Sequence, residues 1–141
     1  MPLRIIADDT GDIASWGFST AKCTPMLYNA AFGVFDGDEL KGCILFTGYN
    51  GSEAEIHFQG VGALNRYTFR TIHRIALQHF NLNRLYVRTR KLSMARGVVK
   101  LGAVYEGKQR RVYGPTDDDC HAAECFVFFR ETMAKIAKIE A

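Results

Sequence analysis

The residues with the clearest potential for chemistry lie in the segment EIHFQ, residues 55–59. Alternate side chains of a strand point to the same face, so Glu55, His57 and Gln59 share one face. A carboxylate or an imidazole can accept a proton from a nucleophile, and an imidazole titrates near neutral pH. We therefore expect Glu55 or His57 to be a general base, with half-buried positions on a mixed sheet face as the alternative.

Two glycines, Gly60 and Gly62, follow this strand directly, and a helix is expected to begin near residue 64. The first N–H groups of a helix have no partner within the helix, and its dipole adds partial positive charge there. Glycines let the backbone approach a phosphate group closely, and Asn65 and Arg66 could add donors. The segment therefore predicts a phosphate-binding loop, with an ordinary strand-to-helix turn as the alternative.

The elements that must position these residues can be predicted from periodicity and turn residues. Phe69, Ile72, Ala76 and Phe80 lie at helical spacing and give the main helix one apolar face. A three-strand meander followed by a helix and another strand indicates a mixed α+β sheet. Strands are expected at 3–7, 30–35, 40–47, 54–59, 84–89 and 124–132, with one bent strand or a strand pair at 103–113. Helices are expected at 13–23 (interrupted by Gly17), 64–80, 93–102 and 133–141.

Composition and length indicate that the whole chain forms one globular domain. The 141 residues are 48% hydrophobic and 23% charged, which is enough to build a core. The net charge of +3 is too small to indicate nucleic-acid binding by itself. No apolar run reaches the roughly 20 residues needed to span a bilayer, and the N-terminus lacks the apolar region of a signal peptide. We expect a cytoplasmic protein that does not bind membranes.

The four cysteines, Cys23, Cys43, Cys120 and Cys125, do not form a Cys-x-x-Cys motif. The spacing of Cys120, His121 and Cys125 matches no zinc pattern, so no metal site is predicted. We expect free and mostly buried thiols.

With its glycine loop between the central strand and the main helix, this order of elements resembles the GNAT superfamily of N-acetyltransferases. The segment Gln59–Leu64, QGVGAL, resembles the family's acetyl-CoA motif Gln/Arg-x-x-Gly-x-Gly/Ala, with Leu64 as the departure. KLGAVYEG, residues 100–107, resembles the family's Lys-x-Gly-Phe-x-x-Glu-Gly segment, with Ala103 in place of Phe. The resemblance covers roughly residues 30–130 and looks closest to a small phage and bacterial branch.

The resemblance implies an acetyl-CoA or other acyl-CoA site. In the family, the pantetheine arm pairs like an extra strand with the central strand, where the sheet splays apart. Lys91 and Arg96 lie where a 3′-phosphate could sit. The residues expected to bind the cofactor are Phe58, Gln59, Gly60, Gly62, Ala63, Leu64, Asn65, Arg66, Lys91 and Arg96.

The acid that protonates the leaving thiolate is where the sequence departs most from the family. Many members have a Tyr four residues before the helix-ending glycine, and that position here is Val98. Ser93 and Tyr105 are substitutes nearby. A thiolate is a tolerable leaving group, so loss of the Tyr does not prevent transfer in principle.

The residues that could bind the acceptor amine are less clearly indicated by the sequence. Trp16 and Phe18 could shape an acceptor pocket or cap the core, and the acidic loop 117–119 could attract a cation or be simply solvated. Arg66, Arg70 and Arg74 form one stripe on the main helix, which is either a solvated face or a phosphate-backbone contact.

We therefore expect an acetyl-CoA-dependent N-acetyltransferase that moves the acetyl group to a primary amine by direct attack in a ternary complex. The acceptor is a small molecule or a protein, and a homodimer is left open. One alternative is a catalytically inactive GNAT-fold phage structural or interaction protein. Another is acyl-type modification of a nucleobase.

Overall fold

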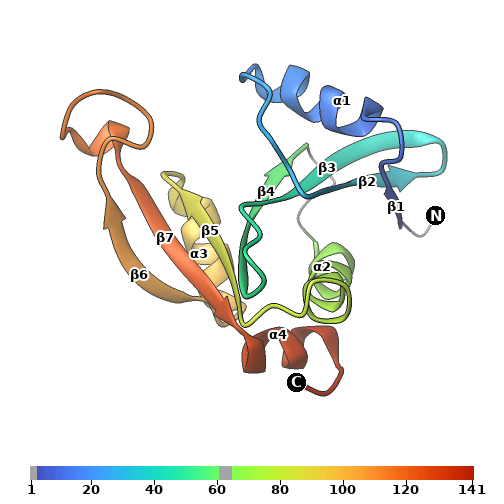
Figure 1. The fold of residues 1–141 in the computed structure, drawn as a ribbon. Coiled ribbons are helices and arrows are strands. Elements are labelled where there is room, and N and C mark those ends of the chain that lie inside the picture. The colour runs from blue at the N-terminus through green and yellow to red at the C-terminus, as the bar shows by residue number, and fades with distance from the viewer. Residues whose placement is uncertain (1–2, 61–64) are drawn as a thin grey trace.

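A computed structural model describes residues 3–60 and 65–141. Its elements follow the predicted order along the chain (Figure 1). The strands are β1 (Leu3–Ala7), β2 (Ala30–Asp36), β3 (Glu39–Thr47), β4 (Glu53–Gln59), β5 (Arg84–Thr89), β6 (Val104–Gln109) and β7 (Ala123–Phe129). The helices are α1 (Asp12–Ala21), α2 (Arg66–Gln78), α3 (Leu92–Lys100), the short 3₁₀ helix η1 (Asp119–His121) and α4 (Arg130–Ala137).

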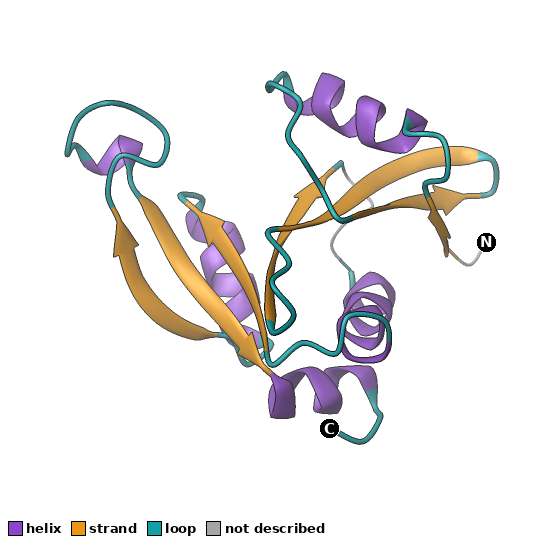
Figure 2. Ribbon diagram, in the orientation of Figure 1, coloured by secondary structure: helices purple, strands orange, loops and turns teal. Residues whose placement is uncertain are grey.

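The strands of the described residues form one mixed sheet with the order β1-β2-β3-β4-β5-β7-β6. Every pairing is antiparallel except that of β4 with β5. This parallel pairing joins only 53–55 of β4 to 84–86 of β5. Beyond it the two halves of the sheet diverge, as Figure 2 shows. The predicted α+β sheet, splayed at its centre, is confirmed.

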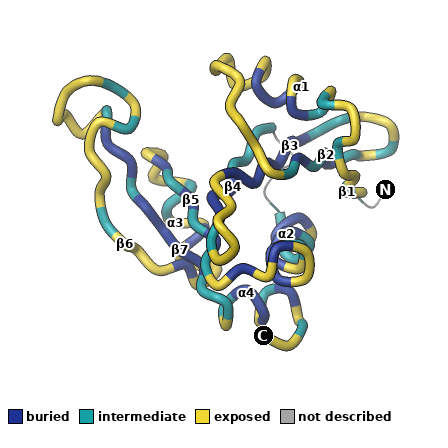
Figure 3. Tube along the Cα trace, viewed as in Figure 1, coloured by how far each residue is buried: buried dark blue, intermediate teal, exposed yellow. Residues whose placement is uncertain are grey.

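The face of the sheet that carries α2, α3 and α4 holds most of the core. Strand β4 contributes Ala54 and Ile56 to this core, and α2 contributes three residues of the predicted apolar stripe. The fourth, Phe80, is in the same core but lies beyond the end of the helix, which the prediction had extended to residue 80. The stripe also includes His73, which is fully buried. Figure 3 shows this buried interior between the sheet and α2.

A second, smaller core lies on the opposite face, beneath α1. Phe18 of α1 packs there with Cys43 and Leu45 of β3. Gly17 lets the helix approach closely, because a Cβ at this position would lie 2.8 Å from the Sγ of Cys43. The prediction that Gly17 interrupts the helix is wrong, since α1 continues through it.

Two predicted boundaries are also wrong at the C-terminal end. The strand predicted at 124–132 ends at Phe129, because its partner strand β5 begins at Arg84, opposite Phe129. Arg130 then starts α4, and its backbone N–H donates to the carbonyl of Asn83. The strand or strand pair predicted at 103–113 is the single strand β6, which ends before a turn in which Arg111 has a positive φ of 60°.

The thiols are free in the described residues, but only Cys43 and Cys125 are buried, whereas Cys23 and Cys120 are exposed. The prediction of mostly buried thiols is therefore half right. No helix in the described part of the chain is long and apolar enough to cross a membrane.

Candidate active site at the splayed strands

The candidate site is centred on the point where β4 separates from β5. Within the described residues, no strand pairs with the β5-facing edge of 56–59, although β5 continues to pair with β7 through Thr89. The polar backbone groups on the facing edges of the two strands are therefore available to an extended ligand. The predicted residues Phe58 and Gln59 lie on this segment of β4.

Gly60 ends the strand with a φ of 99°, a conformation that favours glycine. A Cβ there would lie 2.4 Å from the carbonyl oxygen of Lys41 and 2.9 Å from the ring of Trp16. Gly60 is therefore required by the close packing of its own backbone against β3 and α1. The predicted loop residues Gly62, Ala63 and Leu64 lie outside the described residues.

Asn65 begins α2 as its N-cap. Its side chain accepts a hydrogen bond from the backbone N–H of Thr68, and the hydroxyl of Thr68 accepts one from the N–H of Asn65. This capping box fixes the start of the helix. Asn65 was expected to bind the cofactor, and the structure gives its side chain a capping role beside the site.

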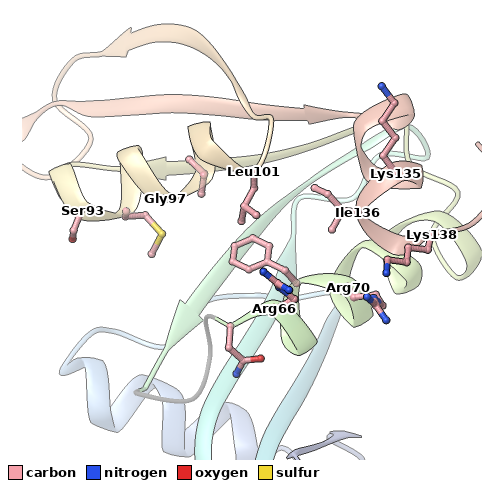
Figure 4. A pocket seen from close by; sticks show the side chains of 12 residues that line it. Arg66, Arg70, Ser93, Gly97, Leu101, Lys135, Ile136 and Lys138 are labelled. Carbon is pink, nitrogen blue, oxygen red and sulfur yellow. The ribbon is translucent and has the colours of Figure 1, made fainter.

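A pocket of about 560 Å³ opens next to this helix start, between α2, α3 and α4 (Figure 4). Leu101, directly after α3, and Ile136 of α4 point into it from opposite sides in the close-up. Among the described residues, apolar side chains and four cationic ones line the pocket, and no carboxylate does. Its lining is Asn65, Arg66, Phe69, Arg70, Ser93, Met94, Gly97, Val98, Leu101, Lys135, Ile136 and Lys138.

The cationic residues Arg66, Arg70, Lys135 and Lys138 form no ion pair with any described residue. Unpaired cations above an apolar floor suit a ligand with both phosphate groups and an apolar part. Sequence reasoning found Arg66 but missed the two lysines, because their contribution depends on how α4 docks against α2. The guanidinium of Arg74 supports that docking by donating to the carbonyl of Ala137 at 3.2 Å.

Lys91 and Arg96, which were expected to bind the cofactor, are exposed and do not line this pocket. The backbone N–H of Lys91 donates to the hydroxyl of Thr89 at the start of α3. Of the expected cofactor residues, Asn65 and Arg66 therefore line the pocket, whereas Lys91 and Arg96 do not.

Glu55 and His57 lie on the opposite face of the sheet, as predicted. Glu55 is buried and accepts two hydrogen bonds from the guanidinium of Arg88, at 2.8 and 2.9 Å. The carboxylate is therefore held by a bidentate ion pair, which makes Glu55 a poor candidate for a free base. Sequence reasoning missed this partner, because β4 and β5 are joined only through the fold.

His57 is half-buried beside this pair. Its Nε2 lies 2.8 Å from the Oγ1 of Thr47 and 3.6 Å from the Oε1 of Glu55. Both neighbours can accept a hydrogen bond from Nε2–H, and Nδ1 has no hydrogen-bond partner among the described residues. Burial lowers the pKa of His57, the Glu55 carboxylate opposes that shift, and Arg88 adds to it. The arrangement supplies a neutral imidazole with a free ring nitrogen.

The two residues suggested as a leaving-group acid lie apart from His57. Ser93 lines the cationic pocket on the other side of the sheet. Tyr105 packs against Phe126 with its ring tilted, near the outer edge of the sheet, and donates a hydrogen bond to Glu124. This hydrogen bond is the main reason why the pKa of Tyr105 is raised. Val98, at the family's tyrosine position, is buried in the core.

A further aromatic residue lies close to the splay point. Tyr86 of β5 is opposite Glu55 in the register, on the same face of the sheet. It lines a polar pocket of about 290 Å³ together with Glu53, Arg84, Arg88, Glu106, Gly107, Lys108, Gln109 and Cys125. Burial raises the pKa of Tyr86, so its hydroxyl stays protonated at neutral pH.

The acidic loop does not extend toward His57. Asp117 pairs with Arg111 at 2.8 Å, and Asp119 pairs with Lys108 at 2.8 Å. The acidic loop and the basic turn at 108–111 therefore neutralise each other. In the described residues no group of three or more His, Cys, Asp or Glu side chains could hold a metal ion.

No protein-family model and no curated protein matches the sequence, whereas the solved structures that resemble this chain include N-acetyltransferases. Mutant forms of the spermidine/spermine N-acetyltransferase SpeG from Vibrio cholerae align with a TM-score of 0.74 at 13% identity, over 95% of this chain and 98% of theirs. The spermidine N-acetyltransferase from Vibrio cholerae in complex with CoA and spermine aligns with a TM-score of 0.70 at 14% identity, over 93% and 97% of the two chains. The chain therefore has the GNAT fold.

Proposed function

We propose that this protein is an acetyl-CoA-dependent N-acetyltransferase that acts on a primary amine. The observation that carries the proposal is the unpaired edge of β4 at 56–59, next to a cationic pocket and on the same strand as His57. A fold alone does not determine an activity, whereas these three features of the site together support acetyl transfer. A solved neighbour with the same fold is in complex with CoA and spermine, which is consistent with this use of the fold.

The residues of the pocket fit the cofactor. Arg66, Arg70 and Lys138 would hold its phosphate groups, together with the N–H groups at the start of α2. The apolar floor at Phe69 and Leu101 would take its uncharged parts. The open edge of β4 would hydrogen-bond the extended arm that leads from this pocket to the other side of the sheet. When bound, acetyl-CoA supplies the acetyl group as an activated thioester.

His57 would act on the acceptor amine. In the tautomer whose Nε2–H donates to Thr47, the free Nδ1 would accept the proton that the amine loses during its attack. The amine nitrogen would form a bond to the acetyl carbonyl carbon as the carbon–sulfur bond breaks. The thiolate would take a proton from water, and the imidazolium of His57 would return its proton to the solvent, so that the base is regenerated. Glu55, held by Arg88, keeps a negative charge 3.6 Å from the imidazole and so stabilises the imidazolium that forms.

Isothermal titration with acetyl-CoA and with desulfo-CoA tests the binding step. We expect stoichiometric binding of both compounds, weakened by added salt because phosphate contacts contribute to it. No measurable binding at high micromolar ligand would overturn the proposal and favour an inactive protein that keeps the fold.

A matched pair of variants identifies the phosphate site. Arg70→Glu places a carboxylate in the pocket and should weaken acetyl-CoA binding at least tenfold. Arg96→Glu makes the same charge change at an exposed position of α3 outside the pocket, and should bind acetyl-CoA nearly as well as the wild type. If the Arg96 variant lost more affinity than the Arg70 variant, the phosphate site would be misassigned.

A further inference from the structure

A small apolar pocket lies on the His57 side of the sheet, beneath α1. Its volume is about 150 Å³, and the backbone of β4 at the splay point forms part of its wall. Helix α1, the segment after it, and strands β3 and β4 supply the lining. The lining residues are Gly17, Phe18, Ala21, Cys23, Met26, Cys43, Leu45, His57, Phe58 and Gln59.

No Asp, Glu, Lys or Arg side chain of the described residues lines this pocket. An ammonium group buried there would have no carboxylate among the described lining residues, which is costly. The carboxylates of the adjoining polar pocket are already paired, because Glu53 and Glu106 lie 3.7 and 2.7 Å from the guanidinium of Arg84. Neither pocket therefore offers an unpaired carboxylate to an acceptor that carries several positive charges.

The size of the pocket limits what can fill it. An apolar cavity of about 150 Å³ stays dry and can hold benzene, as an engineered cavity in another protein shows. A phenyl ring or a branched alkyl group of similar size thus fits the volume and the apolar lining. A longer or more polar substituent would have to extend past the pocket toward solvent.

We propose that the acceptor is a primary amine with one compact apolar substituent of about the size of a phenyl ring, which binds in this pocket beside His57. The inference rests on the proposed function, since it names the acceptor of the same site. The substituent packs against Phe18 and Leu45, and the amine nitrogen lies toward the imidazole, at the end of the pocket nearest the splayed strands.

The test is the kcat/KM for acetyl transfer from acetyl-CoA to three amines, measured by the release of free thiol and by the mass of the product. We expect 2-phenylethylamine to exceed both spermidine and glycine at least tenfold. A preference for spermidine or glycine, with acetyl transfer intact, would overturn this inference and leave the proposed function in place. Failure to acetylate any of the three would overturn the proposed function itself, together with this inference.

Two variants on α1 locate the substituent. Ala21 is exposed at the end of the helix and lines the pocket, so Ala21→Leu should fill the space without disturbing the core. We expect this variant to raise the KM for 2-phenylethylamine at least fivefold, with unchanged affinity for acetyl-CoA. Thr20→Leu changes a neighbouring exposed residue that does not line the pocket, and its KM should match the wild type. Equal KM values for the Ala21 variant and the wild type would overturn the assignment of the pocket.

Discussion

The two faces of the central sheet differ in what they bury, although the same strand supplies both. Strand β4 presents Ala54 and Ile56 to the extensive core beneath α2, α3 and α4, and Glu55 and His57 to the opposite face. The opposite face has one helix, a small core and half-buried polar groups. The alternation of one strand thus separates the residues that hold the fold from those available for chemistry.

This difference has a physical basis. Burial of apolar side chains dominates the free energy of folding, so the face with three helices must be packed tightly. The face beneath α1 contributes less, and it can keep a small apolar pocket and a network of Thr47, His57, Glu55 and Arg88. A ligand that lay along the unpaired edge at the splay point would reach both the cationic pocket on one face and His57 on the other.

Substitutions in the main core should reduce the free energy of unfolding the most. Phe128 is almost fully buried there, and Phe128→Ala should lower the free energy of unfolding by about 3–5 kcal/mol. Leu45→Ala, on the small core beneath α1, should cost about 2 kcal/mol, because Leu45 already borders a pocket. Urea unfolding followed by circular dichroism measures both values. A larger loss for Leu45→Ala would contradict the assignment of the main core.

His73, on the main-core face, should make stability depend on pH. Its Nδ1–H donates to the carbonyl of Phe69 at 2.7 Å, and its Nε2 is buried without a hydrogen-bond partner among the described residues. Burial lowers its pKa to about 4. The unfolded chain therefore binds the proton more readily, and the stability that is present above pH 6.5 should fall by about 3 kcal/mol as the pH drops toward 4.

The matched variants for this prediction are His73→Leu and His79→Leu. The first removes the buried imidazole, so its free energy of unfolding should lose the extra dependence on pH between 6.5 and 4. The second changes an exposed histidine at the end of the same helix and should keep the wild-type slope. Identical slopes in both variants would exclude His73 as the cause.

On the face beneath α1, we expect a substitution to lower the catalytic rate. His57→Gln should lower kcat at least a hundredfold, since a positioned general base contributes about 10²–10⁴ in rate. His79→Gln serves as the control, because His79 is exposed and lies 22 residues after His57 in the sequence. A His57 variant with wild-type kcat would remove the imidazole from the mechanism.

The dependence of the rate on pH gives a second test of His57. The rate should fall with decreasing pH as His57 is protonated, at a pH below the usual range of histidine, because burial lowers its pKa. Glu55 raises the pKa of His57, so Glu55→Gln should move this limb to still lower pH. A shift in the opposite direction would contradict the arrangement of charges around the imidazole.

The sequence predicted the fold and one face of the site well. Period-two alternation was sufficient to place Glu55 and His57 together, and helical spacing predicted the apolar stripe of α2. Both of these signals are local, so a short window of residues contains each of them. The splay at the centre of the sheet was expected only from the resemblance to the GNAT superfamily.

The rest depended on contacts between distant segments. Arg88 meets Glu55 only because β4 and β5 pair, and Lys138 reaches the pocket only because α4 docks on α2. Lys91 and Arg96 were expected near the phosphates from the resemblance, but the pocket takes its cations from other helices. No sequence window contains such information, since it depends on packing across the sheet.

Acetyl transfer to an amine at the splayed strands can be measured as the release of free thiol from acetyl-CoA by the purified wild-type protein, with and without 2-phenylethylamine. We expect release that depends on the amine, saturates with both substrates, and falls at least a hundredfold in His57→Gln. Thiol release that is absent, or that is the same with and without any amine acceptor tested, would contradict acetyl transfer at this site.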